Sequence, residues 1–501
     1  MLATSFTAAI VGVDAHLVRV EADTASGFPR FTMVGLPDSS IRESEGRIRA
    51  ALRNCGFGFK WDRRITINMA PASLRKMGSS YDLATAVGLL AADGLLPQGP
   101  LGDVLLVGEL ALDGSLRPVN GVLPMMLLAR RHRIPVAIVP ESNGCEAALV
   151  PGVQVYAVRS LPEAVALAAT PDRPRPPDPP RPPAPPTPKL DMADVRGQAQ
   201  ARRAIEIAAA GGHNLLLSGP PGSGKTMLAR RVPGLLPPLT PAEAIETTAI
   251  HSAWGARQDI LIGTRPFRSP HHTASDAALV GGGTIPRPGE VSLAHNGVLF
   301  LDELPEFPRH ALDALREPLE ERAVSVSRVR GTLRLPARFQ LVAAMNPCPG
   351  GYRGDRARSC SCTPHRVRSY QARVSGPLLD RIDLHAGVGP LSYAEMTSPP
   401  GERTEIIARR VARARSLQER RLPGILNADL EATQIRTLVT LDSDGRRLME
   451  AAVDRLGMTG RAHDRLLRVA RTLADLEGAL PVTARHVAEA LQFRQAPGNT
   501  V

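Results

Sequence analysis

Short apolar runs alternate with amphipathic stretches over the first third of the chain. Residues 65–69, 104–107 and 136–139 have the apolar character and the length of short strands, and the segments between them repeat apolar positions with helical spacing. This alternation predicts a mixed α/β domain over residues 1–170.

A second set of strands is expected after residue 189. Residues 214–218, 298–301 and 339–344 are almost wholly apolar, which is typical of parallel strands covered on both faces by crossover helices. From about residue 401 the pattern becomes helical, over residues 402–421, 445–456, 464–476 and 484–493. We therefore expect a parallel-sheet α/β domain over residues 189–390 and an all-helical domain over residues 391–501.

A proline-rich segment separates the two halves. Residues 171–188 read PDRPRPPDPPRPPAPPTP, with eleven prolines in eighteen positions. Such a segment packs neither as helix nor as sheet, so it predicts a stiff polyproline II linker. A ligand for an SH3-type domain is the alternative.

The composition narrows the class of protein. A chain of 501 residues with 43% hydrophobic residues can form two or three cores. No run approaches the roughly 20 apolar residues of a membrane span, and the first residues lack a secretory signal pattern. We therefore expect a cytoplasmic protein with no membrane partner. The five cysteines are an odd number in a long chain, which favours reduced thiols.

The charge balance favours an acidic partner. The formal net charge is +12, and nucleic acid is the commonest partner of such a basic chain. Only four of the 61 basic residues are lysines, so arginine is abundant throughout and an individual arginine says little about function. A lysine is more informative, and Lys225 is one of the four.

A glycine-rich loop follows the apolar run that ends at Ser218. The loop reads GPPGSGKT and comprises Gly219, Pro220, Pro221, Gly222, Ser223, Gly224, Lys225 and Thr226. This is a complete Walker A motif, and it lies between a predicted strand and a predicted helix, as a phosphate-binding loop requires. Its backbone N–H groups can surround the phosphates of ATP, Lys225 can reach the outer phosphates, and the Thr226 hydroxyl can bind Mg²⁺. The alternative, a chance glycine-rich turn, does not account for this context.

An acidic pair follows the next apolar run. Residues 298–301 lead directly into Asp302 and Glu303. Downstream of a Walker A motif, the pair predicts that Asp302 completes the Mg²⁺ coordination and that Glu303 activates the water that attacks ATP. Without that motif, an acidic pair after a strand is more often a solvated strand end.

Two further residues fit ATP hydrolysis. Asn346 ends an apolar strand, where its amide can orient the attacking water; an ordinary turn asparagine is the alternative. Arg381, within GPLLDRID, can act as an arginine finger for a neighbouring subunit, because a guanidinium neutralises charge on the transferred phosphoryl group. For Arg381 the alternative is a local salt bridge with Asp380 or Asp383.

The order of these motifs points to a family. GPPGSGKT, VLFLDEL, AAMNPCPG and GPLLDRID are followed by RAHDRLLRVARTLADL, and the chain also contains FTMVGLPDSSIRESEGRIRAAL and SPHHTASDAALVGGG. Together they resemble the magnesium-chelatase-like AAA+ family, and more closely its ComM-like (YifB-like) group, over nearly the whole chain. The resemblance implies a homo-hexameric ring with ATP between subunits. It also implies a helicase that drives branch migration of single-stranded or branched DNA in homologous recombination or natural transformation, together with recombination proteins. It implies Arg465 as the sensor-2 arginine that reaches the nucleotide of its own subunit, with Arg461 as the alternative.

Three cysteines and a histidine follow Asn346. Cys348, Cys360, Cys362 and His365 could hold zinc in a tetrahedral site. ComM-like proteins usually show CPCG where this chain has PCPG, so one cysteine of that pattern is missing. Free thiols in a loop are therefore the favoured alternative.

The N-terminal domain resembles the Lon-protease (S5-like) fold. Ser80 falls where that family's serine lies, but residues 118–125, where the resemblance places its catalytic lysine, contain none. A Ser-Lys hydrolase needs the amine to deprotonate the hydroxyl, so we expect a catalytically dead module for interaction or assembly.

Two segments are candidates for DNA contact. Residues 251–290 are longer than a simple crossover needs and predict an inserted element, in which the pair His271 and His272 is interpreted as structural. Residues 324–335 predict a hairpin around an Arg-Gly turn. Related rings point such hairpins into their pore, where the arginines would bind phosphates; these are Arg328, Arg330 and Arg334. A solvated hairpin is the alternative.

Three classes of function remain at this point. The first is a DNA branch-migration motor, the second a magnesium-chelatase-type remodelling ATPase subunit, and the third an ATP-dependent Lon-like protease. The missing lysine disfavours the protease, and the extent of the ComM-like resemblance disfavours the chelatase subunit.

Overall fold

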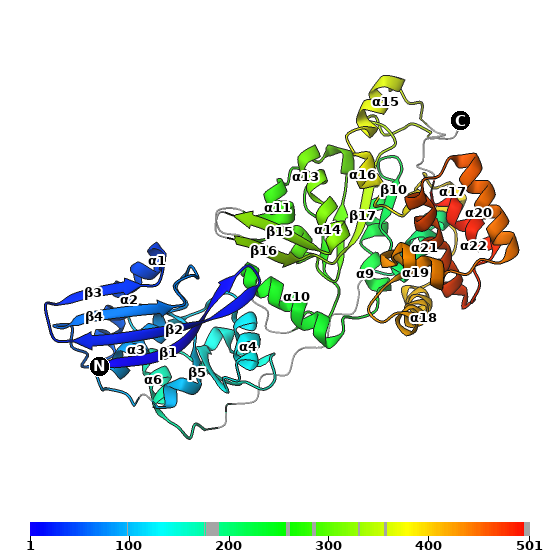
Figure 1. Ribbon diagram of the computed structural model, residues 1–501. Helices are drawn as coiled ribbons and strands as arrows, with labels where there is room; N and C mark the ends of the chain where they lie inside the picture. Colours follow the sequence, from blue (N-terminus) through cyan, green and yellow to red (C-terminus); the bar gives the residue numbers. More distant parts are fainter. Residues whose placement is uncertain are drawn as a thin grey trace. The chain divides into compact units, whose positions relative to one another are not determined.

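The computed structural model describes residues 1–97, 99–174, 176, 190–256, 261–282, 287–328, 331–354 and 358–494. The chain forms two compact units (Figure 1). The first comprises residues 1–184, 241–262 and 286–288, and the second comprises the remainder. Most of the proline-rich segment, including residues 177–188, lies outside the described residues. None of the helices in the described ranges is both long enough and apolar enough to cross a membrane.

The first unit is built on a seven-stranded mixed sheet in the order β3-β4-β2-β1-β5-β8-β9. Its strands are β1 (Leu2–Val11), β2 (Asp14–Ala25), β3 (Arg30–Val34), β4 (Arg64–Ala70), β5 (Val104–Leu106), β8 (Val136–Pro140) and β9 (Gln154–Val158), with β6 (Glu109–Leu110) and β7 (Leu116–Arg117) as a separate small pair. Its helices are α1 (Ser39–Arg42), α2 (Ser44–Asn54), α3 (Asp82–Ala92), α4 (Val122–Arg131), α5 (Gly144–Ala148), α6 (Leu161–Ala169) and α10 (Pro241–Trp254), with short 3-10 turns at Gly99–Asp103 and Glu141–Asn143.

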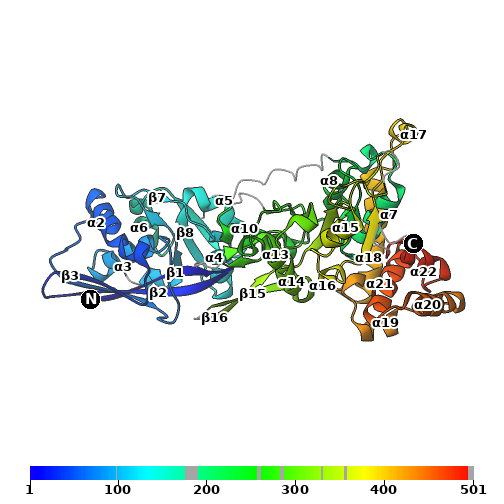
Figure 2. The same cartoon turned by 90° about the horizontal axis from the view of Figure 1, so that it is seen from above.

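Strand direction changes across this sheet. The β1–β2 hairpin is antiparallel, from Leu2 opposite Asp23 to Val11 opposite Asp14, whereas β5, β8 and β9 run parallel to β1. Helix α3 is buried along its whole length and packs on β1 and β2, and Figure 2 shows it on one side of that hairpin together with α2 and α6. The mixed α/β domain expected for this half is therefore confirmed.

Helix α10 belongs to the first unit, although its sequence lies between the Walker A loop and the Asp-Glu pair. Its Ser252 hydroxyl donates to the carboxylate of Glu146, and the Ser252 carbonyl accepts from Gly121 N at 3.1 Å. Glu146 is only 2% exposed and also accepts from Leu123 N at 3.3 Å and from Asn143 Nδ2 at 3.3 Å. A buried carboxylate needs such partners. The inserted element expected at residues 251–290 thus starts earlier, and its helix is part of the N-terminal core.

The second unit contains a five-stranded parallel sheet in the order β11-β14-β17-β10-β18. Its strands are β11 (Phe267–Arg268), β14 (Val298–Leu301), β17 (Gln340–Met345), β10 (Leu215–Ser218) and β18 (Leu384–Gly387). The residues of β10, β14 and β17 are all buried, because helices cover both faces of the sheet. The predicted parallel sheet is confirmed, and the predicted strand at 298–301 coincides with β14.

Short helices surround this sheet, and longer ones complete the unit. The helices up to β18 are α7 (Ala199–Gly211), α8 (Lys225–Ala229), α9 (Val232–Leu235), α11 (Asp276–Val280), α12 (Glu290–Leu293), α13 (Arg309–Ala314), α14 (Arg316–Glu321), α15 (Pro364–Gln371) and α16 (Gly376–Leu379), with 3-10 turns at Met192–Asp194 and Leu304–Glu306. The C-terminal helices are α17 (Tyr393–Met396), α18 (Thr404–Arg421), α19 (Ala432–Leu438), α20 (Ser443–Leu456), α21 (Gly460–Glu477) and α22 (Ala484–Gln492), with a 3-10 turn at Asn427–Asp429. The helical character expected beyond residue 401 is confirmed.

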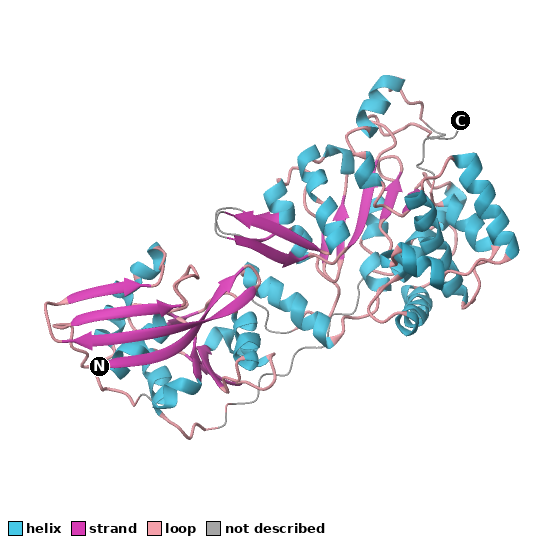
Figure 3. Cartoon of the chain, in the orientation of Figure 1, coloured by secondary structure: helices cyan, strands magenta, loops and turns pink. Residues whose placement is uncertain are grey.

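A two-stranded hairpin lies outside the parallel sheet (Figure 3). It consists of β15 (Ala323–Arg328) and β16 (Gly331–Pro336), paired antiparallel from Ala323 opposite Pro336 to Arg328 opposite Gly331. Val324 and Leu335 are buried at its base, which anchors the hairpin to the second unit. The sequence prediction of a hairpin at 324–335 is confirmed.

Candidate functional site

The strand order of the parallel sheet brings three loops together. The GPPGSGKT loop follows β10, Asn346 follows the neighbouring β17, and Asp302 follows β14 on the far side of β17. All three strands are parallel, so their carboxyl ends lie at the same edge of the sheet. Ligand sites of open parallel sheets form at this edge.

The backbone of the loop explains its glycines. Gly222 and Gly224 have φ values of 77° and 94°, in the left-handed region that favours glycine. A Cβ at Gly219 would overlap the carbonyl oxygen of Val388, so no larger residue fits there. The glycines therefore allow a loop conformation in which main-chain N–H groups can approach a bound phosphate closely.

Lys225 lies inside this loop. Its side chain is 8% exposed, and Nζ donates to Gly219 O at 2.8 Å, to Pro220 O at 2.9 Å and to Asn346 Oδ1 at 3.2 Å. Burial lowers the pKa of Lys225, while the carboxylates of Asp302 and Glu303 oppose that shift. The Lys225 ammonium thus lies near polar groups of three segments: the GPPGSGKT loop, Asn346 after β17, and the Asp302–Glu303 pair after β14.

Thr226 and Asp302 form the oxygen-rich part of the site. The Thr226 hydroxyl donates to Asp302 Oδ2 at 2.6 Å, and the other carboxylate oxygen accepts from Glu303 N at 3.0 Å. A hydroxyl beside a carboxylate is the donor set that Mg²⁺ prefers. Within the described part of the chain the buried Ser223 Oγ has no hydrogen-bond partner, so a polar group of the loop is still available to a ligand. These residues fit a magnesium–phosphate group.

Glu303 contacts a residue whose role the sequence did not reveal. The Glu303 side chain is 52% exposed, and its Oε2 lies 3.1 Å from His272 Nδ1. The His272 ring packs on that of His271 with centroids 4.1 Å apart, and His271 Nδ1 lies 2.9 Å from Thr273 Oγ1. The sequence favours a structural role for both histidines, and their position in the SPHHTASDAALVGGG motif is the one signal that points to them.

Arg381 and both sensor-2 candidates lie in one cavity of about 700 Å³ in the second unit. We call it the arginine cavity; its basic residues are Arg322, Arg338, Arg381, Arg461, Arg465 and Arg468. Acidic residues also line it, and these are Glu320, Asp380, Asp383, Asp429 and Asp464. Among the described residues that line this cavity, none belongs to the GPPGSGKT loop or to the Asp302–Glu303 pair. Among the described residues, the phosphate-binding loop of the same chain therefore does not help to form this cavity.

The contacts within the cavity show how Arg381 is paired in its own chain. Its guanidinium donates to Pro377 O at 2.6 Å and to the Glu320 carboxylate. The local salt bridge with Asp380 or Asp383, considered from the sequence, is not the pairing that forms. Asp380 instead accepts from Arg465 Nη2 at 3.0 Å, which places Arg465 beside the chain segment of Arg381.

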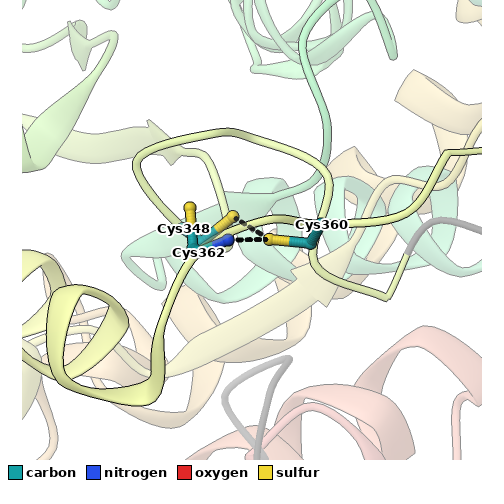
Figure 4. A group of neighbouring side chains, drawn as sticks. All are labelled: Cys348, Cys360 and Cys362. Atoms are coloured by element: carbon teal, nitrogen blue, oxygen red, sulfur yellow. Dashed lines mark hydrogen bonds between the residues drawn. The ribbon is translucent and has the colours of Figure 1, made fainter.

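Three of the four candidate zinc ligands converge. The thiol sulfurs of Cys348, Cys360 and Cys362 all lie within 4.8 Å of one another (Figure 4). Burial raises the pKa of Cys348, but hydrogen bonds from the Cys360 and Cys362 thiols and from the Arg353 and Tyr352 backbones outweigh it and lower that pKa.

His365 is not part of the three-cysteine group in the described structure. Helix α15 starts at Pro364, and its cap, Thr363, accepts from Arg366 N at 3.4 Å. The chain is therefore already helical at His365, and the helix sets the direction of that side chain. The positions of the described side chains therefore do not support His365 as the possible fourth ligand.

Lys76 has a structural role in the N-terminal unit. Lys76 is fully buried and donates to Gly35 O at 3.0 Å, Met69 O at 2.8 Å and Pro71 O, and burial lowers its pKa. The segment expected to carry a catalytic lysine begins α4, where Leu123 is fully buried. Lys76 thus ties three main-chain segments together.

Of the three hairpin arginines, the structure describes the side chain of Arg334 alone. Arg334 is exposed, and its Nη2 lies 3.5 Å from Glu321 O. The backbone of Arg328 lies in β15, whereas Arg330 is outside the described residues. The DNA contacts expected for these residues stay predictions.

The similarity to known proteins covers nearly the whole chain. Residues 191–396 match the family model of magnesium chelatase, subunit ChlI, residues 20–143 match subunit ChlI of Mg-chelatase, and residues 401–494 match the subunit ChlI C-terminal model. Competence protein ComM of Haemophilus influenzae is 43% identical over 98% of this chain and 97% of its own length. Uncharacterized protein YifB of Escherichia coli is 45% identical over 97% of this chain and 96% of its own length. The magnesium-chelatase 38 kDa subunit of Cereibacter sphaeroides is 27% identical over 58% of this chain and 86% of its own length.

Proposed function

Because this chain belongs to the ComM/YifB family of magnesium-chelatase-like AAA+ ATPases, we propose that it is a motor that couples ATP hydrolysis to branch migration of DNA. One observation carries the ATPase part of the proposal: Lys225, Thr226, Asp302 and Asn346 meet at one edge of the sheet. The DNA part is supported by the similarity to a competence protein along nearly the whole chain and by the net charge of +12.

A chelatase-type remodelling subunit is the second candidate. Its supporting observation is the match of all three segments to models named for subunit ChlI. Two relatives that are named chelatase subunits are 26–27% identical over 47–58% of this chain, whereas ComM is 43% identical over 98% of it. The longer and closer similarity favours the DNA motor.

The chemistry of the proposal is phosphoryl transfer to water. Lys225 exchanges its present oxygen partners for the outer phosphates of ATP, and Asn346, now an acceptor for Lys225, orients the attacking water. Glu303 accepts a proton from that water when it is turned away from His272. When bound to Thr226 and Asp302, Mg²⁺ would neutralise charge on the phosphates.

We further propose that the chain acts as a ring, a homo-hexamer in which Arg381 serves the nucleotide of the neighbouring subunit. The arginine cavity supports this arrangement, because the described residues that line it do not include the phosphate-binding loop. Arg465 shares that cavity, so it too is proposed to serve the neighbour's nucleotide, in place of the same-subunit role that the family resemblance suggested. Arg461 remains the alternative to Arg465.

The N-terminal unit is proposed to be a Lon-protease-like fold without protease activity. The burial of Leu123 where a lysine is needed, and the engagement of Lys76 with main-chain carbonyls, support a role in assembly or interaction. A Lon-like protease is therefore not proposed.

ATP hydrolysis by the full chain should be measured with and without single-stranded and branched DNA. DNA should raise turnover, and binding should weaken steeply as salt increases, because phosphate contacts release counterions. Gln replacements at Arg328, Arg330 and Arg334 should lower the log–log salt slope by about 0.7–0.9 for each lost contact. A matched control replaces three exposed arginines of α18, namely Arg409, Arg413 and Arg420, and should bind as the parent does.

Two results would end the DNA proposal. One is an assembled ring whose ATP turnover does not change with DNA at low salt. The other is equal loss of DNA binding in the hairpin variant and in the α18 control, because that would reflect net charge alone.

A further inference from the structure

The three-cysteine cluster joins two ends of one loop. Cys348 lies just after β17, while Cys360 and Cys362 precede α15. Cys348 Sγ and Cys360 Sγ are 3.4 Å apart, and all three sulfurs lie within 4.8 Å of one another (Figure 4). The loop therefore brings its two ends together through sulfur atoms.

Two main-chain N–H groups point at these sulfurs. Gly350 N donates to Cys362 Sγ at 3.3 Å, and Cys362 N donates to Cys360 Sγ at 3.4 Å. A Cβ at Gly350 would lie 3.0 Å from Cys362 Sγ, so the close approach of this backbone depends on glycine. N–H donors to sulfur stabilise thiolates, the form of cysteine that binds metals.

We propose that Cys348, Cys360 and Cys362 form a zinc site with three thiolate ligands and one position open to water. In a tetrahedral site with Zn–S bonds of about 2.3 Å, the sulfurs are about 3.8 Å apart. The sulfur–sulfur distances in the structure, 3.4 Å for one pair and at most 4.8 Å for the others, are close to this value. A disulfide would use two of these cysteines and gives no reason for the third to converge. Thiolates are soft ligands that select Zn²⁺ over Mg²⁺ and Ca²⁺. Binding Zn²⁺ releases three thiol protons to solvent.

The zinc site supports the catalytic edge of the sheet. Cys348 is two residues beyond Asn346, whose amide contacts Lys225, and Gln371 Nε2 donates to Pro347 O at 3.4 Å. A Cβ at Gly351 would lie 2.6 Å from Pro221 Cδ, so the loop packs directly on the GPPGSGKT loop. A metal that holds this loop in one conformation also holds Asn346 in position. This consequence rests on the proposed ATPase function, whereas metal binding does not.

Metal content of the full chain is the primary measurement. The chain is purified in a non-thiol reductant and analysed for zinc by mass spectrometry, with an expected value of one zinc per chain. The Cys360→Ser, Cys362→Ser double variant should contain none. A Cys55→Ser, Cys145→Ser variant, with two substitutions of the same kind in the other unit, should retain it. Cobalt exchanged into the parent should give thiolate-to-cobalt absorption that the first variant lacks.

A reduced parent chain with no more zinc than the Cys360→Ser, Cys362→Ser variant would overturn the proposal. Loss of zinc from His365→Ala would contradict the three-thiolate assignment. ATP turnover of the zinc-free double variant should fall about 10- to 100-fold, because small displacements of a catalytic group cost this much. Zinc bound to a chain that does not hydrolyse ATP would refute the ATPase proposal and leave the metal site standing. ATP hydrolysis by a parent chain that contains no zinc would refute the metal site and leave the ATPase proposal standing.

Discussion

Replacing Lys225 and Glu303 one at a time should separate nucleotide binding from hydrolysis. Lys225 is buried, and its ammonium donates to oxygens of three residues that it would exchange for phosphate oxygens. A hydrogen bond to a charged group is worth about 1.5–3 kcal/mol, so Lys225→Ala should lose about 3 kcal/mol, or roughly 150-fold in Kd.

Glu303→Gln should have the opposite profile. The Glu303 side chain is about half exposed, and it contacts His272 rather than a residue of the GPPGSGKT loop. An amide of the same size should leave the Kd for ATP within about twofold. Loss of the general base should slow turnover about 10²- to 10⁴-fold.

Glu306→Gln is the matched control, because Glu306 lies three residues further along and pairs with Arg373 at 2.8 Å. It should leave turnover unchanged. The assays are equilibrium titration with a fluorescent ATP analogue and steady-state phosphate release. Turnover of Glu303→Gln within threefold of the parent, or an equal loss in Glu306→Gln, would refute the assignment of Glu303.

Three more outcomes follow from the contacts described above. His272→Ala should raise basal ATP turnover about 1.4- to 5-fold, since a partly exposed polar contact that holds Glu303 is worth about 0.2–1 kcal/mol; a fall in turnover would mean that His272 positions Glu303 for catalysis. Mixing inactive Arg381→Ala with inactive Lys225→Ala chains should restore part of the activity, and no recovery in verified mixed rings would place the action of Arg381 within its own subunit. Burial lowers the pKa of His385 from 6.5 to about 4, so the unfolded chain binds a proton at a higher pH than the folded chain does. The free energy of unfolding is therefore highest above pH 6.5 and decreases as the pH falls towards 4. Urea unfolding should show a loss of about 2 kcal/mol between pH 7 and pH 5 that His385→Gln lacks, and an equal loss in both chains would contradict this attribution.

Segments whose local sequence matches their environment could be predicted. The apolar run at 298–301 forms β14 because it is buried on both faces, and β10, which is also buried throughout, follows the same rule. The GPPGSGKT loop could be predicted because its glycines stand where the backbone needs positive φ angles, and this pattern is visible in the sequence alone. The arginine hairpin was predictable for the same reason, since its Arg-Gly turn separates two alternating strands.

Features that depend on distant contacts could not be predicted. The addition of α10 to the N-terminal unit depends on the bond between Ser252 and Glu146, two polar residues 106 positions apart. The contact of His272 with Glu303 requires the fold to bring them together. The same holds for Arg465, whose partner Asp380 belongs to a different element 85 positions earlier.

The most direct test of the central claim is strand movement on a labelled synthetic four-way DNA junction. The full chain is incubated with the junction and ATP, and the products are separated by native electrophoresis. ATP should convert the junction into the exchanged duplexes, whereas neither ADP with the parent chain nor ATP with the Glu303→Gln variant should do so. An assembled chain that hydrolyses ATP at an undiminished rate and leaves the junction intact would contradict the claim that it is a branch-migration motor.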